Sequence, residues 1–313
     1  MTAEGDSDRA RFLADVVAGL GQPQKQIPCR WLYDETGSEL FEQITRLEEY
    51  YPTRVETGII GDNLAAIAGF LGRGAIIEYG AGSCRKTEPI IAAARPVRYL
   101  PIDISAEMLE TQARHLRQLF PAVRIEPIVG DFTDPALLLP PGDATRSVFF
   151  PGSTIGNFTD PQIDALLAGM SRMVGPGGRA VVGMDLRKPL PVLLAAYDDR
   201  DGVTAAFNRN LLVRANRELG ADFDLSAFRH EARWNERDSA IEMHLVSTVA
   251  QVATIGEARF HFAAGETIHT ESSRKFTLAG FEVSAARNGW TLQQVWRDAQ
   301  SWFAVVGIAA NPG

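Results

Sequence analysis

Ala75-Ile76-Ile77-Glu78-Tyr79-Gly80-Ala81-Gly82-Ser83 is the most informative stretch of this sequence. Its first five residues are typical of a short buried strand, and two glycines separated by one residue follow directly. Glycine lets the backbone of a turn pass close to a ligand. The helix that we expect to begin near Thr87 presents free N–H groups at its start. The stretch therefore predicts a strand, a ligand-binding turn and a helix, in that order.

The same order of strand, turn and helix repeats toward the C-terminus. Further strands are expected at residues 97–103, 124–129, 147–150 and 179–186. Strands that alternate with helices indicate a parallel sheet with helices on both faces. Two last strands, at residues 291–298 and 301–310, are spaced as an antiparallel hairpin that closes the sheet. The sequence therefore predicts the α/β class.

The alternation stops between residues 188 and 276, and this break divides the chain. A helix is expected within residues 198–219, and the pattern of antiparallel strands follows at 233–253 and 257–264. The N-terminal residues are expected to form helices and turns that Pro52 closes, followed by one helix at 54–70. We expect an α/β domain from residues 53–187 and 277–313. A second, smaller α+β domain is expected from residues 1–52 and 188–276.

Composition excludes several classes of protein. The net charge is −8, which disfavours a nucleic-acid-binding surface because such a surface needs a basic patch. No apolar run approaches the roughly 18 residues of a membrane span, and the polar N-terminus does not fit a signal peptide. The two cysteines, Cys29 and Cys84, cannot form a disulfide framework, which fits the cytoplasm. The five histidines show no metal-binding spacing, so we expect no metal.

Acidic residues at the ends of the next two strands suggest which cofactor the turn binds. Asp103 lies about 20 residues after Gly80, where a carboxylate can accept from both hydroxyls of a ribose. Asp131 and Phe132 end the third strand and suit an adenine, because the carboxylate accepts from its amine and the ring covers it. The turn lacks the third glycine of a dinucleotide motif. A ribose-bearing cation without phosphate fits best, which favours S-adenosylmethionine over a nicotinamide cofactor.

The loop after the fourth strand offers groups that can bind an amine. It has the sequence Gly152-Ser153-Thr154-Ile155-Gly156-Asn157. Ligands bind beyond the carboxyl ends of parallel strands. The carbonyl of Gly152 can accept from an amine, and the side chain of Asn157 can both donate and accept. The alternative is a structural loop in which Asn157 or Asp160 caps the next helix.

Several longer motifs, spread along the chain, together resemble those of one protein family. The first is Tyr33-Asp34-x-x-Gly37-Ser38-x-Leu40-Phe41-x-x-Ile44-Thr45-x-x-x-Glu49-Tyr50-Tyr51-Pro52-Thr53-Arg54. It is followed by Glu78–Ser83 with Lys86-Thr87, by Pro101–Ser105, by Gly152–Asn157, and by Gly265–Phe276 with its Thr270-Glu271-x-Ser273. Together these motifs resemble the histidine-specific Nα-methyltransferases, which form hercynine in ergothioneine biosynthesis. The resemblance covers nearly the whole chain.

This resemblance implies a Rossmann-like methyltransferase fold and a role for each matching position. S-adenosylmethionine would be bound by Gly80, Lys86, Asp103, Asp131 and Phe132. Asn157 and Tyr197 would hold the substrate's carboxylate. The carbonyl of Gly152 and the side chain of Asn157 would orient its α-amine. The imidazole would be recognised by Tyr50, Glu271 and Ser273, with Tyr33 nearby. Phe41 and Met243 would wall the pocket, and Ser272 would add backbone contacts in a turn from Glu271 to Ser273.

The resemblance also implies the reaction, three successive methyl transfers from S-adenosylmethionine to the α-amine of L-histidine. We expect a monomer whose partner is this small substrate. No general base is assigned, because no histidine or carboxylate is required beside the amine. Two alternatives stay open: methylation of another amino acid or small amine on the same scaffold, and an inert S-adenosylmethionine-binding protein. Intact Asn157, Tyr197 and Glu271 favour the enzyme.

Overall fold

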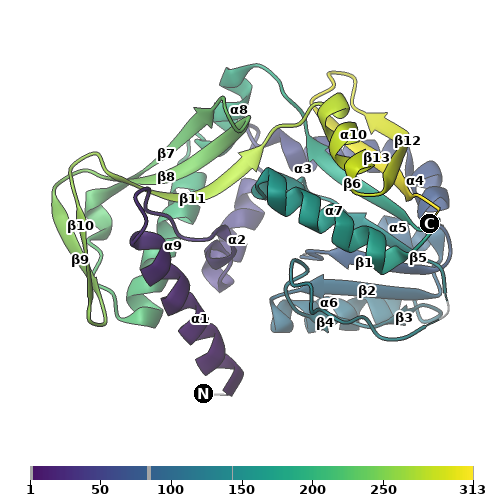
Figure 1. Ribbon diagram of the computed structural model, residues 1–313, viewed down its shortest axis with the longest axis horizontal. Helices are drawn as coiled ribbons and strands as arrows, with labels where there is room; N and C mark the ends of the chain where they lie inside the picture. Colours follow the sequence, from purple (N-terminus) through teal and green to yellow (C-terminus); the bar gives the residue numbers. More distant parts are fainter. Residues whose placement is uncertain (1–2, 83–85, 143, 313) are drawn as a thin grey trace. The chain divides into compact units, whose positions relative to one another are not determined.

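The chain forms two compact units in this computed structural model, which describes residues 3–82, 86–142 and 144–312. Ser83 and Cys84, at the end of the glycine-rich turn, therefore lie outside the described residues. The first unit consists of Met1–Tyr51 and Lys188–Arg274, and the second of Pro52–Arg187 and Lys275–Gly313. Figure 1 labels the elements of both.

The second unit is built on one eight-stranded sheet with the order β12-β13-β6-β5-β1-β2-β3, and β4 also pairs with β2. Its strands are β1 (Ala75–Tyr79), β2 (Arg98–Asp103), β3 (Arg124–Ile125), β4 (Ile128–Val129), β5 (Arg146–Phe150), β6 (Arg179–Asp185), β12 (Trp290–Arg297) and β13 (Phe303–Ala310). Strands β1 to β6 pair in parallel, whereas β13 is antiparallel to both β6 and β12. The expected α/β class, with a parallel sheet and an antiparallel hairpin at its end, is confirmed.

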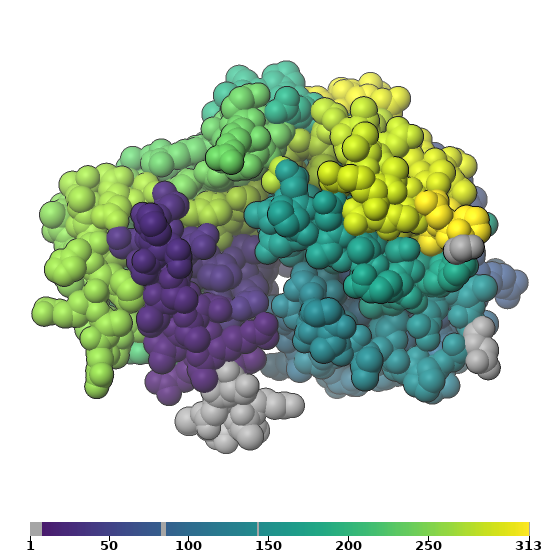
Figure 2. Space-filling view, viewed as in Figure 1, coloured from purple at the N-terminus to yellow at the C-terminus, as the bar shows by residue number. Residues whose placement is uncertain are grey.

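Helices cover both faces of this sheet. They are α3 (Tyr51–Asp62), α4 (Leu64–Leu71), α5 (Thr87–Ala94), α6 (Ala106–Leu119), α7 (Asp160–Val174) and α10 (Leu278–Arg287). Successive strand residues point to opposite faces, so Ile77 packs with α7 and α10 while Ile76 packs with α3 to α6. Helices α7 and α10 lie side by side (Figure 1), and Figure 2 shows the atoms of this face. Asp164 of α7 accepts from the Ser284 hydroxyl of α10 at 2.9 Å.

Proline accounts for two departures from the expected elements of the second unit. The strand expected at 124–129 is two short strands, because Pro127 has no N–H to donate to the ladder. Pro52 does not close the N-terminal segment but lies in the first turn of α3, where a missing N–H costs no hydrogen bond. The single helix expected at 54–70 is divided at Asn63 into α3 and α4.

The first unit combines helices with two small antiparallel sheets. Its helices are α1 (Ala3–Leu20), α2 (Glu35–Ile44), α8 (Leu190–Tyr197) and α9 (Val203–Leu219), with short 3₁₀ turns at Cys29–Leu32 and Leu225–Ala227. One sheet has the order β11-β8-β7, from β7 (Phe228–Asn235), β8 (Ala240–Ser247) and β11 (Thr267–Arg274). The other pairs β9 (Gln251–Ile255) with β10 (Ala258–Phe262). The segment from Glu271 to Ser273 is thus strand and not the expected turn.

The Tyr-Asp-x-x-Gly motif at the start of α2 has a structural explanation. Asp34 is the N-cap residue and accepts from the Gly37 N–H at 2.8 Å. It also accepts from the side-chain amide of Asn210 on α9 at 2.7 Å. A Cβ at position 37 would lie 1.8 Å from the Leu32 carbonyl oxygen, so only glycine fits. The motif therefore fixes α2 against α9 and carries the aromatic residues that flank it.

Candidate active site

The glycine-rich turn and Asp103, both in the second unit, are the residues expected to bind the cofactor. Gly80 and Gly82 have φ angles of +67° and +46°, in the left-handed region that favours glycine. The two carboxylate oxygens of Asp103 accept from the Gly82 N–H at 3.3 Å and the Ser105 N–H at 3.0 Å. The carboxylate at the end of β2 is therefore held beside the turn at the end of β1, as the sequence predicts.

Phe132 is brought to the same turn. A Cβ at Gly80 would have a carbon of the Phe132 ring 3.8 Å away as its nearest neighbour. The ring stacks on Tyr79 with centroids 5.0 Å apart, which fixes its plane. Asp131 accepts from the Thr133 N–H at 2.9 Å. Gly80, Asp103 and Phe132 thus meet at the ends of β1 and β2 and just after β4.

Lys86, also expected at the cofactor, has a partner that sequence analysis missed. Its ammonium forms an ion pair with Glu56 of α3. Glu56 is only 1% exposed and also accepts from the Gly152 N–H at 2.8 Å. An acidic residue within the otherwise helical pattern of 54–70 carries no signal of this role, because a charge there normally marks a solvated helix face.

The loop after β5 has an unusual backbone. Gly152 and Ser153 have φ angles of +86° and +57°, and the Ser153 hydroxyl accepts from the Asp185 N–H at 2.9 Å. A 3₁₀ turn then runs from Thr154 to Asn157. The N-cap residue of α7 is Thr159, so neither Asn157 nor Asp160 has the capping role that was the structural alternative.

An aromatic cluster in the first unit contains several of the residues expected to bind the substrate. Tyr33 lies against Phe41, Phe41 against Tyr50 and Tyr50 against Tyr197, with ring centroids 5.5, 6.2 and 6.1 Å apart. Phe207 of α9 completes the cluster, 5.5 Å from Tyr33. The structure therefore gathers four predicted residues from distant parts of the chain. Sequence analysis missed Phe207, which an amphipathic helix pattern does not distinguish from a core residue.

Glu271 brings a carboxylate to this cluster. It is 9% exposed and lies two residues from Ser273, whose hydroxyl is 2.7 Å from that of Tyr197. Burial, followed by the charge of Glu271, holds the pKa of Tyr33 well above its ordinary value. The same two causes raise the pKa of the Cys29 thiol to about 12. The Glu271 carboxylate thus lies near a Tyr33 hydroxyl and a Cys29 thiol that both keep their protons, and a carboxylate suits an N–H donor.

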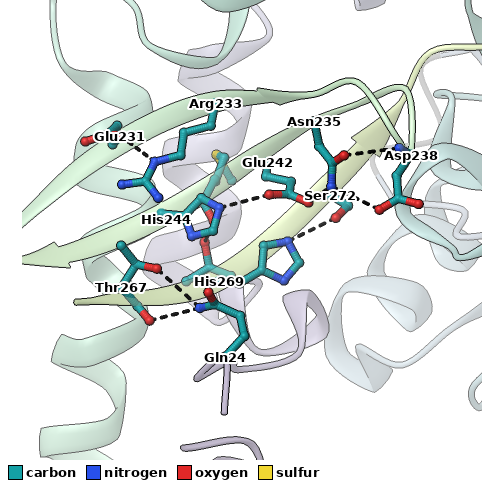
Figure 3. Close-up of polar contacts among 12 residues, drawn as sticks. Gln24, Glu231, Arg233, Asn235, Asp238, Glu242, His244, Thr267, His269 and Ser272 are labelled. Carbon is teal, nitrogen blue, oxygen red and sulfur yellow. Dashed lines mark hydrogen bonds and ion pairs between the residues drawn. The ribbon is translucent and has the colours of Figure 1, made fainter. Parts of the chain in front are cut away.

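The opposite face of β11 carries a different network, shown in Figure 3. Ser272 lies 3.0 Å from His269, through its hydroxyl and the ring Nε2. On the neighbouring strand, His244 Nε2 lies 3.1 Å from Glu242, and this hydrogen bond is the main cause that lowers the Glu242 pKa to about 2. Side chains alternate along a strand, so Ser272 points away from Glu271 and Ser273. Met243 is buried and pairs with Glu271 across the sheet.

Two further properties concern the described part of the chain. No helix within residues 3–82, 86–142 and 144–312 has the length and apolar character needed to cross a membrane. Among the same residues, no three His, Cys, Asp or Glu side chains are grouped so that they could hold a metal ion.

Comparison with known proteins identifies the family. The family model described as histidine-specific, S-adenosylmethionine-dependent methyltransferase matches residues 12–310. The chain belongs to this family. A histidine N-alpha-methyltransferase of Mycolicibacterium smegmatis is 39% identical, over 96% of this chain and 95% of that protein. The protein of the same name from Mycobacterium tuberculosis is 39% identical over 90% of each chain. The N-methyltransferase imqF of Aspergillus flavus is 28% identical, over 86% of this chain and 77% of that protein.

The resemblance and the expected cofactor are thereby confirmed: the protein is a methyltransferase that uses S-adenosylmethionine. The residues at the glycine turn are chemically compatible with that ligand. Asp103 and Asp131 are carboxylates that can accept hydrogen bonds, and the Phe132 ring lies beside the turn. Lys86 places a cation against the Gly152 loop.

Proposed function

We propose that this methyltransferase transfers three methyl groups to the α-amine of L-histidine and forms Nα,Nα,Nα-trimethylhistidine (hercynine), the first step of ergothioneine biosynthesis. Its family and two relatives named histidine N-alpha-methyltransferase support the proposal. The observation that carries it is Glu271, a buried carboxylate beside the paired hydroxyls of Tyr197 and Ser273.

An imidazole matches these groups in hydrogen-bonding capacity. The neutral ring has one N–H donor and one acceptor nitrogen. An ionised Glu271 can only accept, so it takes the N–H, while the hydroxyls of Ser273 and Tyr50 can donate to the other nitrogen. An apolar side chain would offer no hydrogen-bond donor to the buried carboxylate, so the carboxylate would lose contact with water without a new bond, which is costly. Phe41 and Met243 are proposed as the walls around the ring, with Tyr33 nearby.

The remaining roles concern the amino-acid part of the substrate. We assign its carboxylate to Asn157 and Tyr197, and its α-amine to Asn157 and the carbonyl of Gly152. Ser272 is kept only as a source of backbone contacts, because its side chain is bonded to His269.

These residues would catalyse the reaction by orienting the substrate amine toward the methyl group and by excluding water from the amine. S-adenosylmethionine supplies a methyl group on a sulfonium, so positive charge moves to the amine nitrogen and little new charge develops. The Gly152 carbonyl and Asn157 would orient the amine, and orientation of this kind can account for several kcal/mol of a barrier (about 7 in favourable cases). The nearby Glu56 is bonded to Gly152 and Lys86, so we assign it no role as a base. The proton leaves to water.

We propose as well that the protein acts as a monomer in the cytoplasm without a nucleic-acid partner. Its net charge of −8 and its two cysteines support this part of the proposal.

Mass spectrometry tests the reaction directly. The protein is incubated with S-adenosylmethionine and an equal mixture of amino acids, and histidine with one, two and finally three added methyl groups is expected. Histamine is the matched control, because it keeps the imidazole and the amine but lacks the carboxylate. It should be a very poor substrate, since the site's polar groups would be left unpaired. Methylation of another amino acid in preference to histidine would overturn the proposal.

A further inference from the structure

The carboxylate of Glu56 occupies a place that the backbone of the second unit is shaped to receive. Glu56 lies on α3 and is 1% exposed. Beneath it, on β6, Gly183 has no side chain, and a Cβ there would lie 2.0 Å from Glu56 Oε1. Any other residue at position 183 would displace the carboxylate. A buried charge is costly unless it is paired and hydrogen-bonded, so its partners indicate what it is for.

Those partners are two of the segments that flank the candidate cofactor site. Oε1 and Oε2 accept from the Gly152 N–H at 2.8 and 3.0 Å, and Oε2 also pairs with the Lys86 ammonium. A Cβ at Gly152 would lie 3.8 Å from Lys86 Nζ, so the ammonium lies directly against the loop. One carboxylate therefore ties the residue before α5 to the loop after β5.

We propose that Glu56 is a positioning residue for methyl transfer, which rests on the proposed function. It holds the Lys86 ammonium ready for the carboxylate in the methionine part of S-adenosylmethionine. It also fixes the Gly152 N–H, which leaves the carbonyl of the same residue available to the substrate amine.

The geometry supports both parts of this role. An ammonium has three donors, so the bond to Glu56 leaves two, and the Lys86 side chain is still 20% exposed. A lysine side chain that is already ordered loses less conformational entropy when a ligand binds. Gly152 has a φ of +86°, and its N–H bonds to Glu56 hold that conformation.

Glu56→Gln tests the first part, with two unreactive ligands compared by calorimetry. Glutamine keeps the size of the side chain but removes the negative charge that holds the ammonium, and it has one acceptor oxygen where glutamate has two. S-adenosylhomocysteine contains the amino-acid part, whereas 5′-methylthioadenosine keeps the nucleoside and lacks it. We expect affinity for S-adenosylhomocysteine to fall by about 10-fold or more, the usual effect of losing a charged hydrogen bond. Affinity for 5′-methylthioadenosine should change by less than about threefold.

Two further variants make this result specific. Glu88→Gln removes a half-exposed carboxylate from the first turn of α5, where it pairs with His115, and should leave both affinities unchanged. Glu56→Asp keeps the charge but shortens the side chain, so it should show the same selective loss if Glu56→Gln does not fold. If the affinities for both ligands fall equally, or if neither falls, the proposal is overturned, because a purely structural role of Glu56 would not distinguish the two ligands.

Kinetics at saturating S-adenosylmethionine test the second part. Glu56→Gln should raise the KM of histidine several-fold, whereas Lys86→Met, which leaves the Gly152 bond in place, should raise it less. An equal rise would overturn the role assigned to the loop. The calorimetry needs no amino-acid substrate, so its result remains valid if the proposed histidine specificity fails. The mass spectrometry described above likewise does not depend on the role of Glu56.

Discussion

At the scale of single residues, Glu271 is the side chain on which specificity depends. Glu271→Ala should lower kcat/KM for histidine by on the order of 10²-fold, about 2.7 kcal/mol, because the imidazole N–H loses a charged acceptor. Removing the buried charge also removes the penalty against apolar side chains. A competition assay with equal histidine and phenylalanine should then show phenylalanine gaining relative to histidine. Glu271→Gln keeps a neutral acceptor, so its kcat/KM for histidine should lie between those of the wild type and Glu271→Ala. An unchanged product ratio would mean that Glu271 does not recognise the side chain.

Asp103 allows a second test at the same scale. Asp103→Ala should weaken binding of S-adenosylhomocysteine by about 1.5–3 kcal/mol for each charged hydrogen bond lost. Since both ligands contain the ribose, the affinity for 5′-methylthioadenosine should fall by the same amount. Glu56→Gln, in contrast, should weaken only the binding of S-adenosylhomocysteine. Asp134→Ala, at an exposed carboxylate that accepts from the Ala136 N–H, is the control. Calorimetry that shows unchanged affinity in a folded Asp103→Ala variant would disprove the placement.

At the scale of elements, β11 separates two neighbouring serines. Ser273 faces Tyr197, whereas Ser272 faces His269 on the other side of the sheet. Ser273→Ala should therefore raise the KM of histidine by about 5- to 10-fold, the effect of losing a neutral hydrogen bond. Ser272→Ala should leave it within about twofold, and serves as the matched control. Steady-state kinetics of the two variants decide this, and a larger effect for Ser272 would show that the alternation does not determine which serine contacts histidine.

The same strand shows where prediction from sequence ends. The parallel strands around Ile76 and Val181 could be predicted, because they are buried on both faces and form continuous apolar runs. In β11 the buried positions include Thr270, Glu271 and Ser273. Polar residues that face a binding site remove the alternation by which a strand is recognised. Sequence-level rules are expected to fail at such sites, which is why a turn was predicted there.

The two groups of candidate site residues, one in each unit, were predictable for different reasons. Gly80 and Asp103 follow strands, so their meeting follows from the rule that parallel strands end at one edge. Tyr33, Tyr50 and Tyr197 come together through packing of distant segments, which only the family resemblance indicated. Glu56 had neither signal, because nothing in a single helix shows which of its charged residues will be buried.

At the scale of the whole molecule, Glu78 should make stability depend on pH. Burial raises its pKa from 4.5 to about 7, although Thr87 and Tyr99 donate to it at 2.6 Å. The native state thus favours the protonated acid. The contribution of the protonated Glu78 to the free energy of unfolding is fully present below pH 4.5 and is lost as pH rises through about 7. Glu78→Gln should remove this loss of stability at high pH. The loss amounts to about 3 kcal/mol, at 1.36 kcal/mol for each unit by which the pKa is raised.

Urea unfolding of both proteins between pH 4.5 and 8 measures this difference. Burial also lowers the pKa of His230 and His269, which costs stability as pH falls below about 6.5. Both proteins share that acid-side loss, so it cancels when their midpoints are subtracted. A difference that stays constant across the range would show that Glu78 titrates normally.

The position of β13 bears on how the protein folds as it is synthesised. Strand β6 ends at Asp185, but the strand that pairs with its free side does not begin until Phe303. The ribosome makes all of α8 to α10 and β7 to β12 in the meantime. During that interval β6 presents an unpaired edge of buried residues, which invites pairing with other chains. We expect nascent chains that stall before residue 303 to need chaperones, because β6 has no β13 to pair with until those residues have been made.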